Sequence, residues 1–266
     1  MVVDDKLIQF ANRLADASGA AIRPFFRQRI EVDHKEGRHA FDPVTEADRG
    51  GERAIRAIIE RERPDDAILG EEFGEKPGSS SWRWVLDPVD GTRSFITGRH
   101  EWGSLIALEK DGEPVLGILD QPVLGERFIG VNGRSVLIQD DLRTPLKVRA
   151  CDDISQAILC ATDPSAYMTE TQQAAFARVK AKARLTRYHG DCYLFAMLAM
   201  GFIDVIVEGA FRRWDVAAVI PLVECAGGII TDWKGGEWRD GEPLLACGDP
   251  RVHARTVALL AQTVTN

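Results

Sequence analysis

Three acidic segments contain the residues of this sequence best suited to bind divalent cations. The first is Glu71 with its neighbour Glu72, at the end of an apolar stretch. The second is residues 87–92, with the sequence DPVDGT, and the third is Asp215, within WDVAA. Carboxylate oxygens are the ligands that Mg²⁺ prefers, and crowded carboxylates favour a divalent cation between them. Two such cations can position both an attacking water and the leaving oxygen of a phosphate ester.

The DPVDGT segment predicts two carboxylates beside the start of a short helix. Asp87 follows buried strand residues, and Pro88 then turns the chain so that Asp90 comes round to the same side. Gly91 lets a ligand approach the backbone closely. We expect Thr92 to cap the helix that follows, whose first N–H groups can bind phosphate.

Each acidic segment has a simpler structural interpretation when taken alone. DPVDGT consists of common turn residues, the Glu71-Glu72 pair is typical of an exposed strand end, and Asp215 is typical of a helix N-cap. All three segments lie at the end of an element beside a buried run. Together they therefore favour a metal site.

Composition limits the classes of protein that fit. The 266 residues are 45% hydrophobic, which predicts one compact unit with two lobes. The net charge is −8, with 33 basic against 41 acidic residues, which argues against nucleic acid or an anionic membrane as partner. Five scattered cysteines without a CxxC pair indicate reduced thiols in a cytoplasmic protein. The N-terminus does not resemble a signal peptide, and no apolar run reaches the roughly 18 residues of a membrane span.

The first half of the chain predicts two helices followed by a largely antiparallel sheet. Helical periodicity covers residues 4–26 and 45–63, with a loop or loose hairpin over 31–44. Asp111-Gly112 is typical of a hairpin turn between two of the strands. Strand patterns cover residues 67–70, 82–86, 103–108, 115–119 and 127–131.

The second half alternates strands and helices, which predicts layered α/β packing. The polar stretch 139–153 separates the halves. We therefore expect an N-terminal α+β lobe, residues 1–145, with most metal ligands, and a C-terminal α/β lobe, residues 146–266, that completes the site. Its expected strands are 157–161, 185–188, 203–207 and 228–231, and its expected helices are 169–183, 192–200, 216–226 and 250–262.

Four segments together resemble the inositol monophosphatase family of Mg²⁺-dependent, Li⁺-sensitive phosphatases. The resemblance implies an α/β (α+β) fold, the family's layered α-β-α-β-α sandwich, in a homodimer. It also implies hydrolysis of a small phosphate monoester by cation-activated water. The segments are DPVTEAD at residues 42–48, GEE at 70–72, DPVDGT at 87–92, and WDVAA at 214–218 with ECAGG at 224–228.

The resemblance also implies two to three Mg²⁺ ions in each active site. Glu71, Asp87 and the carbonyl of Val89 would bind one ion. Asp87, Asp90 and Asp215 would bind a second, and Glu71 with water would hold a third more weakly.

Catalytic and phosphate-binding roles follow from the same resemblance. Thr92 and Asp48 would orient the attacking water, with Glu71 as the third catalytic residue. The N–H groups of Gly91 and Thr92 would hold the phosphate. The five histidines lie outside the acidic motifs, so none is assigned as a catalytic base: His34, His39, His100, His189 and His253.

Within the family, the chain is most similar to the histidinol-phosphatases of histidine biosynthesis, at residues 92–99, 101–108, 117–122 and 190–193. Arg93, Gly190, Asp191 and Glu208 would bind the substrate. Histidinol phosphate carries an ammonium and an imidazole, which favour acids such as Asp191 and Glu208 at the far end of the pocket. The alternative for Asp191 is an N-cap of the helix that starts at Cys192.

Other functions stay open at this point. The same motifs fit family members that act on inositol phosphates, fructose 1,6-bisphosphate or adenosine 3′,5′-bisphosphate. A metal-binding regulator without turnover fits less well, because every acid needed for turnover is present. An RNA-associated or structural role also fits less well, because the charge balance is acidic.

Overall fold

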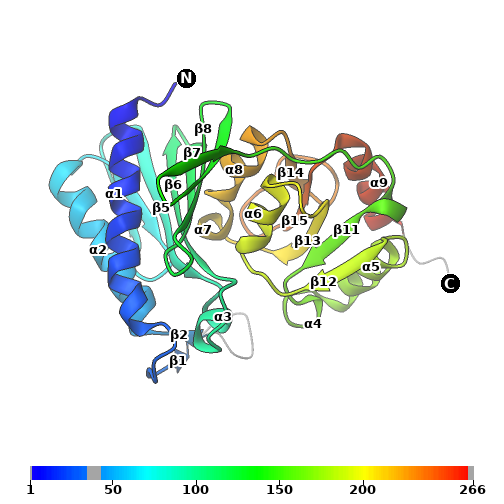
Figure 1. Ribbon diagram of the computed structural model, residues 1–266, viewed down its shortest axis with the longest axis horizontal. Helices are drawn as coiled ribbons and strands as arrows, with labels where there is room; N and C mark the ends of the chain where they lie inside the picture. Colours follow the sequence, from blue (N-terminus) through cyan, green and yellow to red (C-terminus); the bar gives the residue numbers. More distant parts are fainter. Residues whose placement is uncertain (1, 35–42, 263–266) are drawn as a thin grey trace.

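Figure 1 shows the computed structural model of the protein, which describes residues 2–34 and 43–262. Three layers of helices alternate with two sheets, so the expected α-β-α-β-α sandwich is confirmed. The first helical layer covers the larger sheet, the second lies between the sheets, and the third covers the smaller sheet. The layers contain α1 (Asp5–Ile22) and α2 (Glu46–Glu62); α6 (Tyr193–Ala199), α7 (Arg213–Val216) and α8 (Val219–Cys225); and α5 (Glu170–Lys180) and α9 (Pro250–Leu260).

The larger sheet has the strand order β10-β9-β8-β7-β6-β5-β3-β4. Only β3 and β5 pair in parallel, so the prediction of a largely antiparallel sheet is confirmed. Short strands with little burial were not predicted, because they lack the alternation of apolar and polar residues. β10, for example, is exposed along its whole length. The strands are β3 (Ala67–Gly70), β4 (Gly74–Lys76), β5 (Trp82–Asp90), β6 (Gly103–Lys110), β7 (Glu113–Gln121), β8 (Glu126–Val131), β9 (Arg134–Gln139) and β10 (Leu142–Pro145).

The smaller sheet mixes parallel and antiparallel pairs in the order β12-β11-β13-β15-β14. β11 runs parallel to both its neighbours, whereas β15 runs antiparallel to both of its own. Its strands are β11 (Ile158–Ala161), β12 (Leu185–Tyr188), β13 (Val205–Ala210), β14 (Ile229–Asp232) and β15 (Pro243–Cys247). A separate antiparallel pair, β1 (Asp33–His34) with β2 (Pro43–Val44), agrees with the expected loose hairpin. His39 and Asp42 lie outside the described residues.

The central helices join the two sheets through one continuous core. Side chains from β5, β6 and β8 pack with those of α6 and α8 and with strands of the smaller sheet. Two glycines let α8 approach closely, because a Cβ at Gly117 or Gly130 would lie 1.9 Å from the Ala218 carbonyl oxygen or 2.2 Å from that of Pro221. The division into two lobes at residue 145 stays a prediction.

The helix expected over residues 216–226 is α8, which begins later than predicted and is preceded by a separate short helix, α7. α7 ends at Val216, and α8 begins at Val219 after a turn at Ala217 and Ala218. Pro221 has no N–H to donate to the carbonyl of Ala217, so a single regular helix cannot pass through this point. The observed helix therefore begins three residues after the predicted start, and Asp215 lies on the separate helix α7.

The remaining predicted helices agree with the structure to within a few residues. α1 begins after Asp4, whose side chain accepts the Leu7 N–H, and passes into a 3₁₀ turn over Arg23–Phe25 that contains Pro24. In the described part of the chain, no helix combines the length and hydropathy needed to cross a membrane.

Candidate active site

A carboxylate cluster lies where the larger sheet meets the central helices. Asp87, Asp90 and Asp215 each offer an oxygen, and these oxygens all lie within 4.8 Å of one another. Asp87 and Asp90 are three residues apart, so a regular strand would point them to opposite faces. The pairing of β5 with β6 shifts register between them, and this irregularity brings both to one side. α7 brings Asp215 to the same place.

Glu71 follows the neighbouring strand at the same edge of the sheet. β3 and β5 are parallel, with Gly70 opposite Leu86, so the next residues along the two chains, Glu71 after β3 and Asp87 within β5, lie side by side. The Glu71 N–H donates to the carbonyl oxygen of Leu86 at 3.1 Å. Glu71 is close enough for its charge to help raise the pKa values of Asp90 and Asp215.

The electrostatics of this cluster fit a divalent cation. Desolvation raises the pKa of Asp90 to about 7, and the charge of Asp191 adds to the effect. Desolvation and then the charge of Asp90 raise the pKa of Asp215 as well. Desolvated carboxylates that repel one another are unfavourable as anions, and an oxygen-ligated cation between them offsets both effects. The donor set is therefore suited to Mg²⁺.

Thr92 and Asp48 form a hydrogen-bonded pair beside the cluster. The Thr92 hydroxyl lies 3.0 Å from Asp48 Oδ1 and 3.1 Å from the Val89 carbonyl oxygen. Asp48 is buried and also accepts the backbone N–H and the hydroxyl of Thr45, at 2.8 and 2.6 Å. Desolvation nevertheless raises the pKa of Asp48. The expected cap was wrong: Gly91 is the N-cap of α3 (Thr92–Ile96), because the Thr92 hydroxyl is directed to Asp48.

The loop before α6 lies against the start of α3. Asp191 Oδ2 accepts the hydroxyl of Ser94 at 2.6 Å. Gly91 has φ +90°, and a Cβ there would lie 2.9 Å from that of Asp191, so this contact requires glycine. Gly190, at φ +129°, adopts a conformation reserved for glycine. The predicted Gly91, Gly190 and Asp191 are thus brought together.

Asp191 does not cap α6, so that alternative was wrong. The N–H of Cys192 instead donates to Asp90 Oδ2 at 2.6 Å, which ties the carboxylate cluster to the start of α6.

Glu208 is a buried acid on β13 at the far side of this group. It accepts the N–H and the hydroxyl of Thr162, at 2.6 and 2.8 Å. Desolvation, with smaller contributions from Asp191 and Asp90, raises the pKa of Glu208 to about 8. Arg93 on α3 places its guanidinium 4.9 Å from the centre of the Tyr167 ring.

Sequence reasoning missed several of these contacts. Ser94, Thr162 and Tyr167 each contact a predicted site residue, yet none lies in an acidic motif. Ser94 follows DPVDGT by two residues and lies in the stretch 92–99 that carries the resemblance, but neither signal predicted its contact with Asp191.

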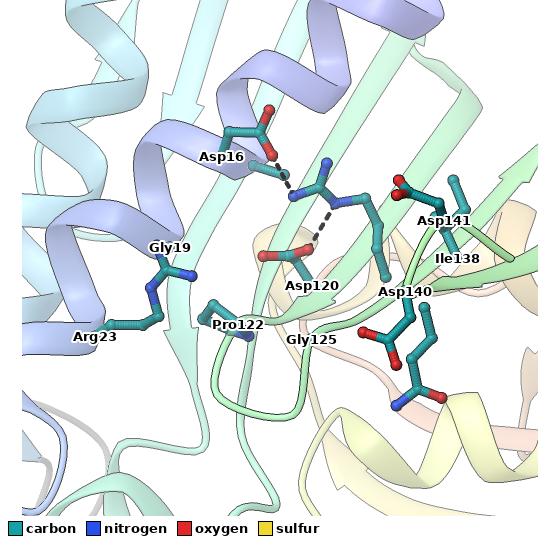
Figure 2. A pocket seen from close by; sticks show the side chains of 12 residues that line it. Asp16, Gly19, Arg23, Asp120, Pro122, Gly125, Ile138, Asp140 and Asp141 are labelled. Atoms are coloured by element: carbon teal, nitrogen blue, oxygen red, sulfur yellow. Dashed lines mark hydrogen bonds and ion pairs between the residues drawn. The ribbon is translucent and has the colours of Figure 1, made fainter.

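A cavity of about 480 Å³ lies apart from the carboxylate cluster, between α1 and strands β7 to β9 (Figure 2). Arg127 lines it and donates to Asp120 at 2.6 Å and to Asp16 at 2.8 Å. The pair with Asp16 links α1 to β8 of the sheet. None of the predicted site residues lines this cavity.

The fold and site define a phosphoric monoester hydrolase: two sheets between helical layers, with an acidic cluster beside a threonine–aspartate pair. The chain belongs to the inositol monophosphatase family, whose model matches residues 3–265. Members of this family are generally Mg²⁺-dependent.

Individual relatives span most of the chain. Bifunctional phosphatase IMPL2, chloroplastic, from Arabidopsis thaliana is 40% identical over 96% of this chain and 75% of its own length. A histidinol-phosphatase from Chlorobaculum parvum is 36% identical over 91% of this chain and 92% of its own. The structure of an inositol monophosphatase from Zymomonas mobilis has a TM-score of 0.85 and 38% identity, and covers 97% of this chain and 98% of that one.

Proposed function

We propose that this protein is a histidinol-phosphatase, which hydrolyses L-histidinol phosphate to L-histidinol and phosphate in histidine biosynthesis. The observation that carries the proposal is a second pair of acids, Asp191 and Glu208, beside the carboxylate cluster. Their charges interact with each other and with Asp90. Asp191 and Glu208 are not among the proposed metal ligands, so their negative charge is available to a substrate. A substrate with a cationic end would neutralise this charge, whereas an uncharged polyol would not. Relatives named histidinol-phosphatase support this choice.

The cation-binding residues in this proposal are those of the carboxylate cluster. Asp87, Asp90 and Asp215, with Glu71 and the carbonyl of Val89, would hold two to three Mg²⁺ ions. When bound, these ions supply Lewis acidity that neutralises phosphate charge and increases the acidity of water.

The protein's own residues orient the reactants. The proton of the Thr92 hydroxyl is directed to Asp48 or Val89, so the lone pairs of its oxygen can accept a hydrogen bond from the attacking water and orient it. The Gly91 and Thr92 N–H groups would hold the phosphate, as a helix N-terminus favours an anion. Arg93 would add positive charge at the same end.

The direct test is phosphate release from histidinol phosphate and from inositol 1-phosphate, side by side, with Mg²⁺ and with a chelator. The proposal expects Mg²⁺-dependent release with clear preference for histidinol phosphate. Preference for inositol 1-phosphate would overturn the substrate assignment, and release unaffected by the chelator would overturn the metal assignment.

An inositol-phosphate phosphatase is the second candidate. The likeness to the Zymomonas mobilis inositol monophosphatase favours it. The raised pKa of Glu208, about 8, also favours it, because a protonated Glu208 binds a neutral hydroxyl better than it binds a cation. The same pair of substrates decides between the two candidates.

We also propose a homodimer located in the cytoplasm. All five cysteines are free, and this agrees with a reducing compartment. Size-exclusion chromatography with light scattering would test the dimer.

A further inference from the structure

We propose that Glu52 is a positioning residue that holds Glu71 in place for cation binding, with Arg56 as its counter-ion; the inference rests on the proposed Mg²⁺-dependent function. Glu52 lies on α2 and its side chain is fully buried. Its carboxylate accepts the backbone N–H of Glu72 at 2.8 Å and that of Phe73 at 3.3 Å. It therefore binds the turn between β3 and β4, in which Glu71 is the first residue.

The backbone before Glu71 is shaped to receive this carboxylate. A Cβ at Gly70 would lie 2.0 Å from Glu52 Oε1, so the carboxylate occupies the space that any larger residue at position 70 would need. The contact is with the last residue of β3, next to Glu71. Glu52 and the start of the turn therefore fit together only when residue 70 is glycine.

Arg56 completes the arrangement one helical turn later. Its Nε donates to Glu52 Oε1 at 2.6 Å, and its guanidinium also donates to the carbonyl oxygen of Gly74. A carboxylate buried this deeply needs a charged partner, and Arg56 supplies it. Because Arg56 also contacts Gly74, the first residue of β4, the pair holds both ends of the turn over residues 71–73.

Hydrogen bonds from two successive backbone N–H groups then fix the chain at Glu71 and Glu72. The Glu71 N–H donates to Leu86 on β5, and the next N–H, of Glu72, donates to Glu52. Asp48, which binds Thr92, precedes Glu52 by four residues and so lies on the same face of α2. One helix face thus aligns both the Thr92–Asp48 pair and the turn that carries Glu71.

The test compares Glu52→Gln with Glu62→Gln, a surface control on the same helix that pairs with Arg13. Mg²⁺ affinity is measured by titration calorimetry, and kinetics by phosphate release over a Mg²⁺ series. Loss of a residue that orients a metal ligand weakens metal binding about 10- to 100-fold. We expect that loss for Glu52→Gln, with the substrate KM at saturating Mg²⁺ nearly unchanged, and wild-type affinity for Glu62→Gln.

Unchanged Mg²⁺ affinity in Glu52→Gln, even with a lower melting temperature, would overturn the inference and leave Glu52 a structural residue only. If Glu52→Gln fails to fold, Arg56→Lys serves instead, because it keeps the charge but loses the fork that reaches Gly74. It should weaken Mg²⁺ binding in the same direction, and unchanged affinity there would equally overturn the inference. A wild-type protein that binds Mg²⁺ but hydrolyses no ester would overturn the proposed function alone, since calorimetry still tests Glu52.

Discussion

Asp90 combines a structural contact with a place in the carboxylate cluster. One of its oxygens accepts the N–H that starts α6, and its side chain also meets Asp87 and Asp215. Desolvation and the charge of Asp191 raise its pKa to about 7. The Asp90 carboxylate is therefore well placed to be a metal ligand, but it destabilises the fold when no cation is bound. Such a trade-off is common at functional sites.

Replacing Asp90 with Asn separates these two roles. The amide oxygen can still accept the Cys192 N–H, but the charge that would hold a cation is lost. We expect turnover to fall by at least about a hundredfold. The melting temperature in chelator should equal or exceed that of the wild type, because a repulsive charge is gone. A near-normal rate of phosphate release would show that Asp90 is not a ligand.

Asp191 tests the choice of substrate. Its φ of +43° lies in the left-handed region, which Asn tolerates well, so Asp191→Asn preserves the backbone. A charge-assisted hydrogen bond to a cation contributes about 1.5–3 kcal/mol, or about ten- to hundredfold in discrimination. We expect kcat/KM for histidinol phosphate to fall by that factor, with a smaller loss for a phosphate ester whose alcohol part is uncharged. Equal losses on both esters would remove Asp191 as the residue that recognises the cationic end.

The raised carboxyl pKa values also predict how stability depends on pH in the absence of metal. Asp90 and Glu208 titrate at about 7 and about 8 in the fold, against about 4 in an unfolded chain. Between these values the folded state binds more protons than the unfolded state, so its stability falls as pH rises. Acids whose pKa is lowered by ion pairs, such as Asp249, titrate below this window.

Thermal unfolding in chelator should therefore show a melting temperature that falls from about pH 5 to about pH 8. Mg²⁺ should raise it most at the upper end, where the carboxylates are ionised. A melting temperature of the metal-free protein that rises across this range would contradict the raised pKa values.

At the scale of elements, the site depends on how closely α8 lies against the larger sheet. Gly117 and Gly130 leave room for the backbone of α8 and the turn before it, which continues from α7. The contact is between backbone atoms, so it cannot relax by a change of rotamer. The position of Asp215 thus depends on two glycines in strands far from it in sequence.

Gly117→Ala should destabilise the fold by about 3 kcal/mol, the upper part of the usual cost of overpacking, because the Ala218 backbone must move. A glycine with free space is the matched control: Gly50, in α2, has nothing within 4 Å of an added Cβ. Gly50→Ala should stabilise by up to about 1 kcal/mol. Chemical denaturation measures both changes, and a neutral Gly117→Ala would contradict the close packing.

Elements with a clear buried periodicity were predicted from sequence, and those without it were not. α1, α2 and β5–β8 follow the predicted segments, because each buries one face or its whole length. β15 is a short apolar run with no alternation and was missed. The turn between α7 and α8 was missed because Ala217 and Ala218 continue the apolar run from Val216 into α8 and carry no turn signal.

At the scale of the whole molecule, the site is built from segments far apart in the chain. Asp90 contacts Cys192, and Ser94 contacts Asp191, across about a hundred residues each. The acidic motifs predicted which residues would meet, through their resemblance to a known family. The partners that join them, such as Glu52 and Ser94, depend on how the two sheets and the central helices pack, which local pattern does not encode.

Mn²⁺ can replace Mg²⁺ at oxygen sites and gives an anomalous X-ray signal, so crystals grown with Mn²⁺ test the central claim most directly. The account predicts anomalous peaks among Asp87, Asp90 and Asp215, with Glu71 reaching one of them. Peaks located elsewhere, with these four side chains turned apart, would contradict it.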